Sequence, residues 1–223
     1  LDLDTLKKYA DFAMYEVKHS TKGEVREFDM EHYRAGVYAM KQRRDFEKLI
    51  RERRVDYYFQ PIVSAHDGHV VAYEALMRPQ LPTLRSPLTV MQLASEMGRV
   101  YDIEKLTLFR ACECYEKLEA AGKLDADALI FVNSIASVSL SDEDWASYRE
   151  AHSAILPKLV VEITEEEEMN ERELERKRNV PGAPGIFALD DYGSGYSNGN
   201  SLLTVSPKYV KVDMAIIRGI DTD

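Results

Sequence analysis

The stretch 70-VVAYEALMRP-79 is an apolar run typical of a buried strand, and it carries two charges near its end. Glu74 follows four apolar or aromatic residues, and Arg78 lies four positions later. Burying a charge is costly unless the charge is paired or holds a metal ion. The sequence therefore leaves two alternatives open: the two charges pair with each other, or Glu74 binds a cation while Arg78 binds an anion.

From Tyr57 onward, short β-rich runs alternate with longer segments of helical pattern, which predicts an α/β domain. The expected strands cover residues 57–63, 69–76, 128–134, 158–164, 185–191 and 209–213. The first two are joined by 64-SAHDG-68, a turn of the hairpin type. The expected helices cover residues 88–98, 102–122 and a charged, mainly solvated segment at 165–178.

Polar side chains stand at or near the ends of these expected strands. They are Glu74, Asn133, Glu162, Asp190, Asp191 and Lys211. A parallel α/β barrel gathers the carboxyl ends of its strands into one mouth, where the active sites of such barrels lie. We therefore expect these side chains to converge in one site.

The chemistry of this set favours a metal site. Carboxylate and amide oxygens select hard cations, so Mg²⁺ and Mn²⁺ are expected, with Ca²⁺ as a further alternative. The adjacent Asp190 and Asp191 suit two ions that clamp a phosphoryl group during an in-line displacement. Arg78 would then contact a phosphate, and Lys211 would stand beside the attacking water.

Each residue also has a structural alternative when it is taken alone. Asn133 suits a turn or a helix cap, Lys211 suits a lysine that lines a barrel without catalysis, and residues 189–198 suit a flexible loop. Their positions on successive strand ends favour the metal site over these separate explanations.

The composition excludes some classes of function. The chain has 223 residues, a net charge of −10 and a pI of about 5.1, which argues against non-specific binding to duplex nucleic acid. No window is long and apolar enough to predict a membrane span. Cys112 and Cys114 lie two apart in an expected helix and are predicted to stay reduced, which suits the cytoplasm.

Two helices are expected before the α/β domain. Residues 3–18 carry apolar side chains at helical spacing, and residues 30–55 form a helical connector that packs by its apolar side. The apolar stripe of the connector consists of Tyr33, Val37, Met40, Phe46 and Leu49.

The ordered motifs YEALMRP, FVNS, VEITE, ALDDYGSGYS and YVKVD resemble those of the EAL-domain phosphodiesterases, which hydrolyse cyclic di-GMP to linear pGpG. The resemblance covers about residues 56–223 and implies a (β/α)8 TIM-like barrel. Residues 9–29 resemble the end of a GGDEF diguanylate cyclase domain. The expected organisation is a cyclase remnant at 1–29, the connector at 30–55 and an EAL domain at 56–223.

The resemblance also implies residue roles and a Mg²⁺ or Mn²⁺ cofactor. The implied metal ligands are Glu74, Asn133, Glu162 and Asp190, with Asp191 for a second ion. The implied catalytic residues are Lys211, Asp191 and Glu165, of which Glu165 would brace the loop after the aspartates. The implied contacts with cyclic di-GMP are Gln60, Glu74, Leu76 and Arg78.

The chain departs from the family pattern at several positions. Pro79 stands where many members have Trp, and Tyr192 and Ser194 stand where Phe and Thr are more common. The later strands of the family, including one that bears a metal-binding glutamate, have no counterpart before Asp223. We therefore expect a barrel that is incomplete at its C-terminal end and is inactive by itself. Two other functions stay open: a cyclic di-GMP receptor without catalysis, and a homodimerisation module built on the connector.

Overall fold

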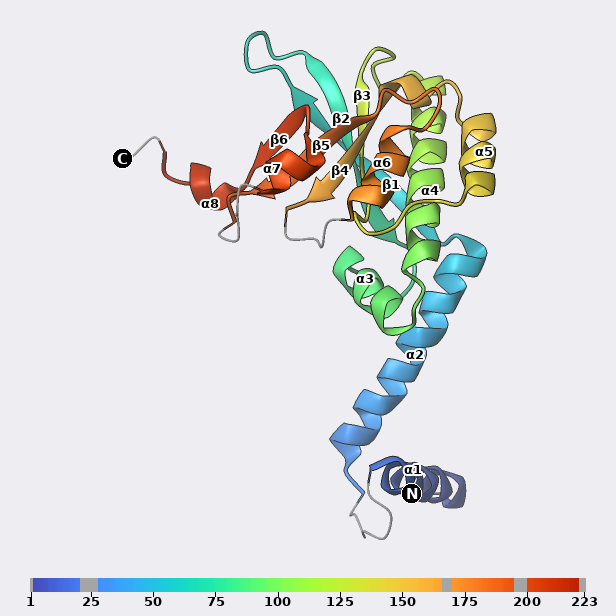
Figure 1. Cartoon of the computed structure of the whole chain (residues 1–223). Coiled ribbons are helices and arrows are strands. Elements are labelled where there is room, and N and C mark those ends of the chain that lie inside the picture. Colours follow the sequence, from blue (N-terminus) through green and yellow to red (C-terminus); the bar gives the residue numbers. More distant parts are fainter. Residues whose placement is uncertain (1, 21–27, 166–169, 195–199, 221–223) are drawn as a thin grey trace.

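The α/β domain is built on one six-stranded sheet, in which the strands are ordered in space as they are along the chain (Figure 1). The computed structural model describes residues 2–20, 28–165, 170–194 and 200–220. β1 (Val55–Val63) and β2 (Val70–Pro79) form an antiparallel hairpin. The strands that follow run parallel to β2 and to one another: β3 (Leu129–Asn133), β4 (Leu159–Thr164), β5 (Ile186–Tyr192) and β6 (Tyr209–Val212). The hairpin expected from the turn at 64–68 is therefore confirmed.

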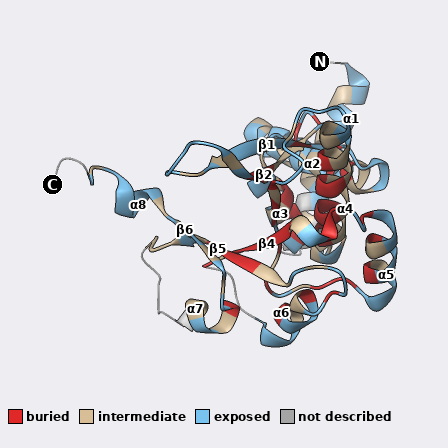
Figure 2. Cartoon of the chain, turned by 90° about the horizontal axis from the view of Figure 1, so that it is seen from above, coloured by how far each residue is buried: buried red, intermediate tan, exposed pale blue. Residues whose placement is uncertain are grey.

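Helices follow the strands, and all but the last of them contribute residues to the core on the outer face of the sheet. They are α3 (Pro87–Glu96), α4 (Val100–Ala120), α5 (Asp142–Ala151), α6 (Glu171–Arg178), α7 (Asn200–Val205) and the short α8 (Met214–Ile217), with a 3₁₀ turn at Leu156–Lys158. Figure 2 shows buried residues along α4, β4 and β5, and exposed ones along α8. Among the described residues, no helix combines the length and the apolar composition that crossing a lipid bilayer requires.

The two faces of the sheet carry different residues, because successive side chains of a strand point to opposite sides. The outer face holds the main core with the helices, and it includes Tyr73, Ala75, Val132, Ile163 and Leu189. The inner face holds a small apolar cluster of Ala72, Phe131, Val160 and Ala188. The two outermost strands, β1 and β6, do not pair with each other in the described part of the chain. The fold is thus a TIM-like barrel that is incomplete, as the sequence predicts.

In the described residues before Val55, two helices precede the sheet. α1 (Leu3–Ser20) packs on the first half of α2 (Met30–Glu52) through aromatic contacts, with the rings of Phe12 and Tyr33 5.1 Å apart. The second half of α2 docks on the domain through Phe46 and Leu49, which are fully buried. Thr83 also donates a hydrogen bond to Asp45 at 2.7 Å. Figure 1 shows the first half of α2 projecting from the domain.

The structure corrects several expectations about the helices. In the expected stripe of α2, Val37 and Met40 are exposed although Phe46 and Leu49 are buried. Of the charged segment 165–178, the structure describes a helix over Glu171–Arg178, which is mainly exposed as expected except for the buried Leu174 and Lys177, and Glu165 is also buried. α5 has no counterpart among the expected helices, although Ser141 caps it by accepting from the Asp144 N–H, a signal that the sequence carries.

Parts of three expected segments lie outside the described residues. They are 21–27 of the stretch that resembles a cyclase tail, 166–169 of the charged run and 195–199 of the loop after the aspartates. The assignment of residues 1–29 to a cyclase remnant, and of 30–55 to a connector between two domains, stays a prediction.

Candidate functional site

The inner face of the sheet changes from apolar to polar toward the carboxyl ends of its parallel strands. On β2 the period of two places Glu74, Leu76 and Arg78 on the same face as Ala72. The strand registers then align the polar residues, because Gln60 lies opposite Glu74, and Asn133 lies opposite Glu162. The registers thus place Glu74, Asn133 and Glu162, three of the side chains expected to converge, on one face of neighbouring strands.

Three carboxylates meet at this edge of the sheet. One oxygen from each of Glu74, Glu162 and Asp190 lies within 4.8 Å of the others. The ammonium of Lys211 contacts all three carboxylates, with its Nζ 3.1 Å from Glu74, 2.8 Å from Glu162 and 2.9 Å from Asp190. Among the residues that the structure describes, three acidic groups thus face one cationic side chain.

Burial and charge shift the protonation of this group. Burial raises the pKa of Glu162 to about 7, and the nearby Glu74 and Asp190 act in the same direction, while Lys211 opposes them. Burial alone would lower the pKa of Lys211, but its pairing with Glu162 and Asp190 outweighs that effect and raises it. Lys211 is therefore an ammonium at neutral pH.

Asn133 and Asp191 flank the three carboxylates in different ways. Asn133 donates a hydrogen bond from Nδ2 to Glu162 Oε2 at 3.3 Å, which leaves the amide oxygen as a further ligand atom. Asp191 is exposed, has a left-handed backbone with φ of 55°, and donates its N–H to the Asp190 carboxylate at 2.9 Å. Asp191 lies outside the group of three carboxylates.

Glu165 is tied to the segment that carries the aspartates. Its Oε2 accepts the N–H of Gly193 at 3.0 Å, and its own N–H donates to the carbonyl of Asp190 at 3.0 Å. The side chain is buried, and its Oε1 has no hydrogen-bond partner among the described residues. These contacts join the residue after β4 to β5 and to the residue that follows it.

Arg78 and Glu74 do not form an ion pair in the described part of the chain, since Glu74 contacts Lys211 instead. Arg78 donates from NH1 to the carbonyl of Met77 at 2.8 Å, and its guanidinium lies 4.9 Å from the ring centre of Tyr58. Tyr58 is 63% exposed and lies opposite Leu76 in the hairpin register. Sequence reasoning missed Tyr58, because alternation along β1 identifies its face only after the register with β2 is known.

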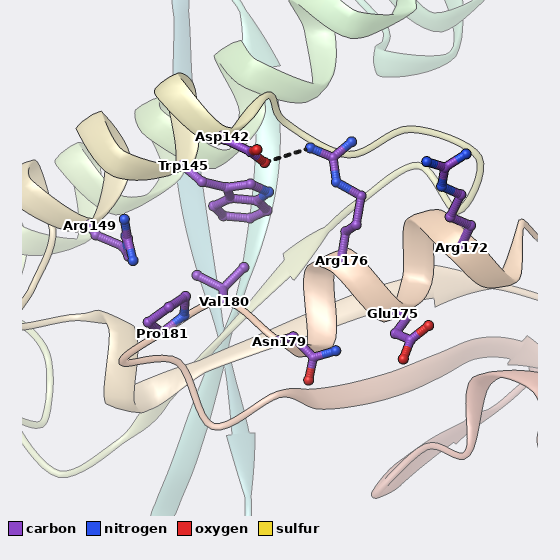
Figure 3. A pocket seen from close by; sticks show the side chains of 9 residues that line it. All are labelled: Asp142, Trp145, Arg149, Arg172, Glu175, Arg176, Asn179, Val180 and Pro181. Carbon is purple, nitrogen blue, oxygen red and sulfur yellow. Dashed lines mark hydrogen bonds and ion pairs between the residues drawn. The ribbon is translucent and has the colours of Figure 1, made fainter.

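Two cavities lie near these elements. The one beside the strand ends has a volume of about 310 Å³ and is lined by Leu76, Arg78, Asn133 and Thr164, among others. A larger one of about 460 Å³ lies between α5 and α6, where Arg176 pairs with Asp142 at 2.9 Å (Figure 3). None of the three clustered carboxylates lines either cavity, but the smaller one adjoins the site through Asn133, whose amide contacts Glu162.

The donor set fits a hard divalent cation. Its three carboxylates and one amide offer only oxygen ligands, which is the preference of Mg²⁺ and Mn²⁺. One ammonium does not balance three carboxylates when all of them are ionised, and a divalent cation would supply the missing positive charge.

Known proteins resemble the chain over most of its length. The cyclic di-GMP phosphodiesterase NbdA of Pseudomonas aeruginosa is 26% identical over 97% of this chain, which matches 28% of that protein. The structure of the PaMucR phosphodiesterase in complex with c-di-GMP is 25% identical, with a TM-score of 0.65 over 82% of this chain and 76% of that one. The structure of Klebsiella pneumoniae BlrP1 with manganese and cy-diGMP is 23% identical, with a TM-score of 0.59 over 75% and 42%.

The matches cover most of this chain but only a part of each curated relative. The first curated relatives are matched over only 27% to 34% of their own length. The sequence pattern of the EAL domain, in contrast, matches residues 43–223 of this chain. The chain therefore belongs to the EAL domain family.

Proposed function

We propose that this domain hydrolyses one phosphodiester bond of cyclic di-GMP to give linear pGpG, with Mg²⁺ or Mn²⁺ as cofactor. The observation that carries the proposal is the group of Glu74, Glu162 and Asp190, whose oxygens lie within 4.8 Å of one another. Relatives and a structural neighbour that are named cyclic di-GMP phosphodiesterases support the choice of substrate.

In this proposal the metal is held by Glu74, Glu162, Asp190 and Asn133, and Asp191 contributes to a second ion. A bound ion would neutralise the phosphate charge and make a water molecule more acidic. Because the pKa of Lys211 is raised, its ammonium holds its proton and acts by donating hydrogen bonds and by electrostatic attraction. It then orients the attacking water and does not act as its base.

The remaining residues position the dinucleotide. Arg78 binds a phosphate, since a guanidinium matches phosphate oxygens in a two-point contact. Gln60 and Leu76, which lie on the same inner face, contact the rest of the ligand. Glu165 holds the segment after the aspartates through Gly193.

The test is to incubate the domain, in the context of the intact protein, with Mn²⁺ and cyclic di-GMP and to separate the products by chromatography. Formation of pGpG is expected, with a loss of at least about 100-fold in rate for Glu162→Gln, since a metal supplies several kcal/mol of transition-state stabilisation. Glu175→Gln, which changes an exposed glutamate on α6, is the matched control.

Other outcomes are equally informative. Binding of cyclic di-GMP by calorimetry without any product would contradict hydrolysis and favour a receptor. A rate that does not respond to Mn²⁺ or to Glu162→Gln would exclude the metal site. Cytoplasmic location, which rests on the free Cys112 and Cys114, and homodimerisation through α2 stay predictions.

A further inference from the structure

A buried ion pair lies behind the metal-binding edge of the sheet. Glu104 on α4 and Lys177 on α6 pair with each other, and each side chain is 1% exposed. Figure 1 shows these two helices on the same side of the sheet. Removing two charges from water is costly, and a buried pair is weak evidence for stability alone. A pair at this position therefore calls for a role beyond joining two helices.

The pair forms hydrogen bonds with the two residues directly after β3. Ser134 donates its hydroxyl to Glu104 Oε1 at 2.5 Å, and Ile135 donates its N–H to Glu104 Oε2 at 2.9 Å. Lys177 in turn donates to the Ser134 hydroxyl oxygen. Both oxygens of one carboxylate are thus used to fix two consecutive residues.

Those two residues immediately follow Asn133, the amide in the candidate metal site. Asn133 is exposed, so packing does not hold its side chain. Its position depends on its hydrogen bond to Glu162 and on the backbone around it, which is fixed before Asn133 by the sheet and after it by Glu104. Ser134 also donates its N–H to the carbonyl of Glu162 at 2.9 Å, so the residue that Glu104 holds is also hydrogen-bonded to β4.

We propose that Glu104 and Lys177 are positioning residues that set the place of Asn133 and thereby the affinity of the site for its divalent cation. This inference rests on the metal site of the proposed function. Partners behind a metal ligand orient it, and their loss typically costs about 10- to 100-fold in metal affinity. Neither residue belongs to the group of three carboxylates.

A purely structural role makes a different prediction. If the pair only joined α4 to α6, its removal would lower the stability of the fold and leave the affinity of the folded protein for Mn²⁺ unchanged. Metal affinity, measured where every variant is folded, therefore separates the two roles.

The chain supplies a matched control on the same helix. Lys158 pairs with Glu119 of α4 at 2.6 Å, and Lys158 lies next to the first residue of β4, at the opposite end of that strand from Glu162. Lys158→Met removes an ion pair between α4 and the sheet layer without touching the strand ends that carry the site.

The experiment measures the dissociation constant of Mn²⁺ for the full chain by electron paramagnetic resonance, in the absence of nucleotide. Glu104→Gln places an amide where two donors need acceptors, and Lys177→Met leaves the carboxylate unpaired. We expect both variants to weaken Mn²⁺ binding by about 10- to 100-fold and Lys158→Met to leave it unchanged. Ser134→Ala, which is milder, is expected to weaken binding in the same direction and covers the case in which the charge variants do not fold.

The outcomes distinguish failure of this inference from failure of the proposed function. If Glu162→Gln abolishes Mn²⁺ binding while the variants at Glu104, Lys177 and Ser134 match the control, the metal site stands and the positioning role is overturned. If Glu162→Gln leaves Mn²⁺ binding unchanged, the metal site itself is wrong.

Discussion

The Nζ of Lys211 lies 2.8 Å from Oε1 of Glu162, and this contact joins the last strand of the sheet to its most buried acid. Glu162 keeps a raised pKa despite this cation, because burial and two further carboxylates outweigh it. The site therefore carries more negative charge than its own lysine can balance.

Lys211→Met is expected to make the protein depend more on metal for its stability. The substitution removes the ammonium that contacts all three carboxylates, so their mutual repulsion in the metal-free protein increases. A ligand present at 100 times its dissociation constant stabilises the folded protein by about 2.7 kcal/mol. For a chain of this size, this raises Tm by roughly 5–10 °C. Thermal unfolding with Mn²⁺ and with EDTA should show a larger shift for Lys211→Met than for the unmodified chain. The exposed Lys208→Met is the control, and an equal shift in all three proteins would contradict the prediction.

The metal-free protein is expected to lose stability as the pH rises through the range set by Glu162. Its pKa is about 7 in the folded state and 4.5 in the reference state, so the folded protein binds more protons between these values. The contribution of Glu162 to the free energy of unfolding is thus fully present below about pH 4.5 and is lost as the pH approaches 7. Urea unfolding in EDTA from pH 5 to 8 should show this fall, and Glu162→Gln should remove it. Parallel curves for the two proteins would show that Glu162 does not titrate there.

Gly193→Ala is expected to destabilise the segment after the aspartates. Gly193 has φ of 91°, and a Cβ at this position would lie 2.1 Å from Cδ1 of Ile216. Left-handed backbone costs other residues about 1–2 kcal/mol, and the clash with Ile216 adds to this cost. In urea unfolding, Ile216→Ala should recover the part of the loss that comes from the clash and leave the backbone part. If the double variant loses as much free energy of unfolding as the two single variants together, the two residues do not interact.

Tyr58→Ala is expected to weaken the binding of cyclic di-GMP by releasing Arg78. The guanidinium lies over the Tyr58 ring, and such an exposed contact is worth about 0.5–1 kcal/mol, or roughly two- to fivefold in affinity. Tyr58→Phe keeps the ring and should bind like the unmodified chain in calorimetry. Loss of affinity in both variants would point instead to the hydroxyl.

The strands and their polar ends could be predicted from the sequence, because a period of two and a run of apolar residues are local properties. The hairpin between β1 and β2 could also be predicted from the sequence, since Asp67 and Gly68 form a recognisable turn. The convergence of Glu74, Glu162 and Asp190 follows once the strands are parallel and in order. These features needed no knowledge of long-range packing.

The rest depends on contacts between distant residues. Glu104 lies in a helix that the sequence predicts, but its burial depends on Lys177, which is 73 positions away. The pairing of Glu74 with Lys211, and not with Arg78, depends on how β6 lies relative to β2. α5 was missed because it is short and polar, and only Trp145 and Tyr148 of its residues are buried.

The connection between α1 and the domain is a single helix without an internal break. α2 has 23 residues, so it is a rod about 35 Å long at a rise of about 1.5 Å per residue. Aromatic contacts with α1 hold one end of this rod. Asp45, Phe46 and Leu49 attach the other end to the domain. A rigid lever of this kind turns a tilt of α1 into a torque at Thr83, only four residues beyond the end of β2.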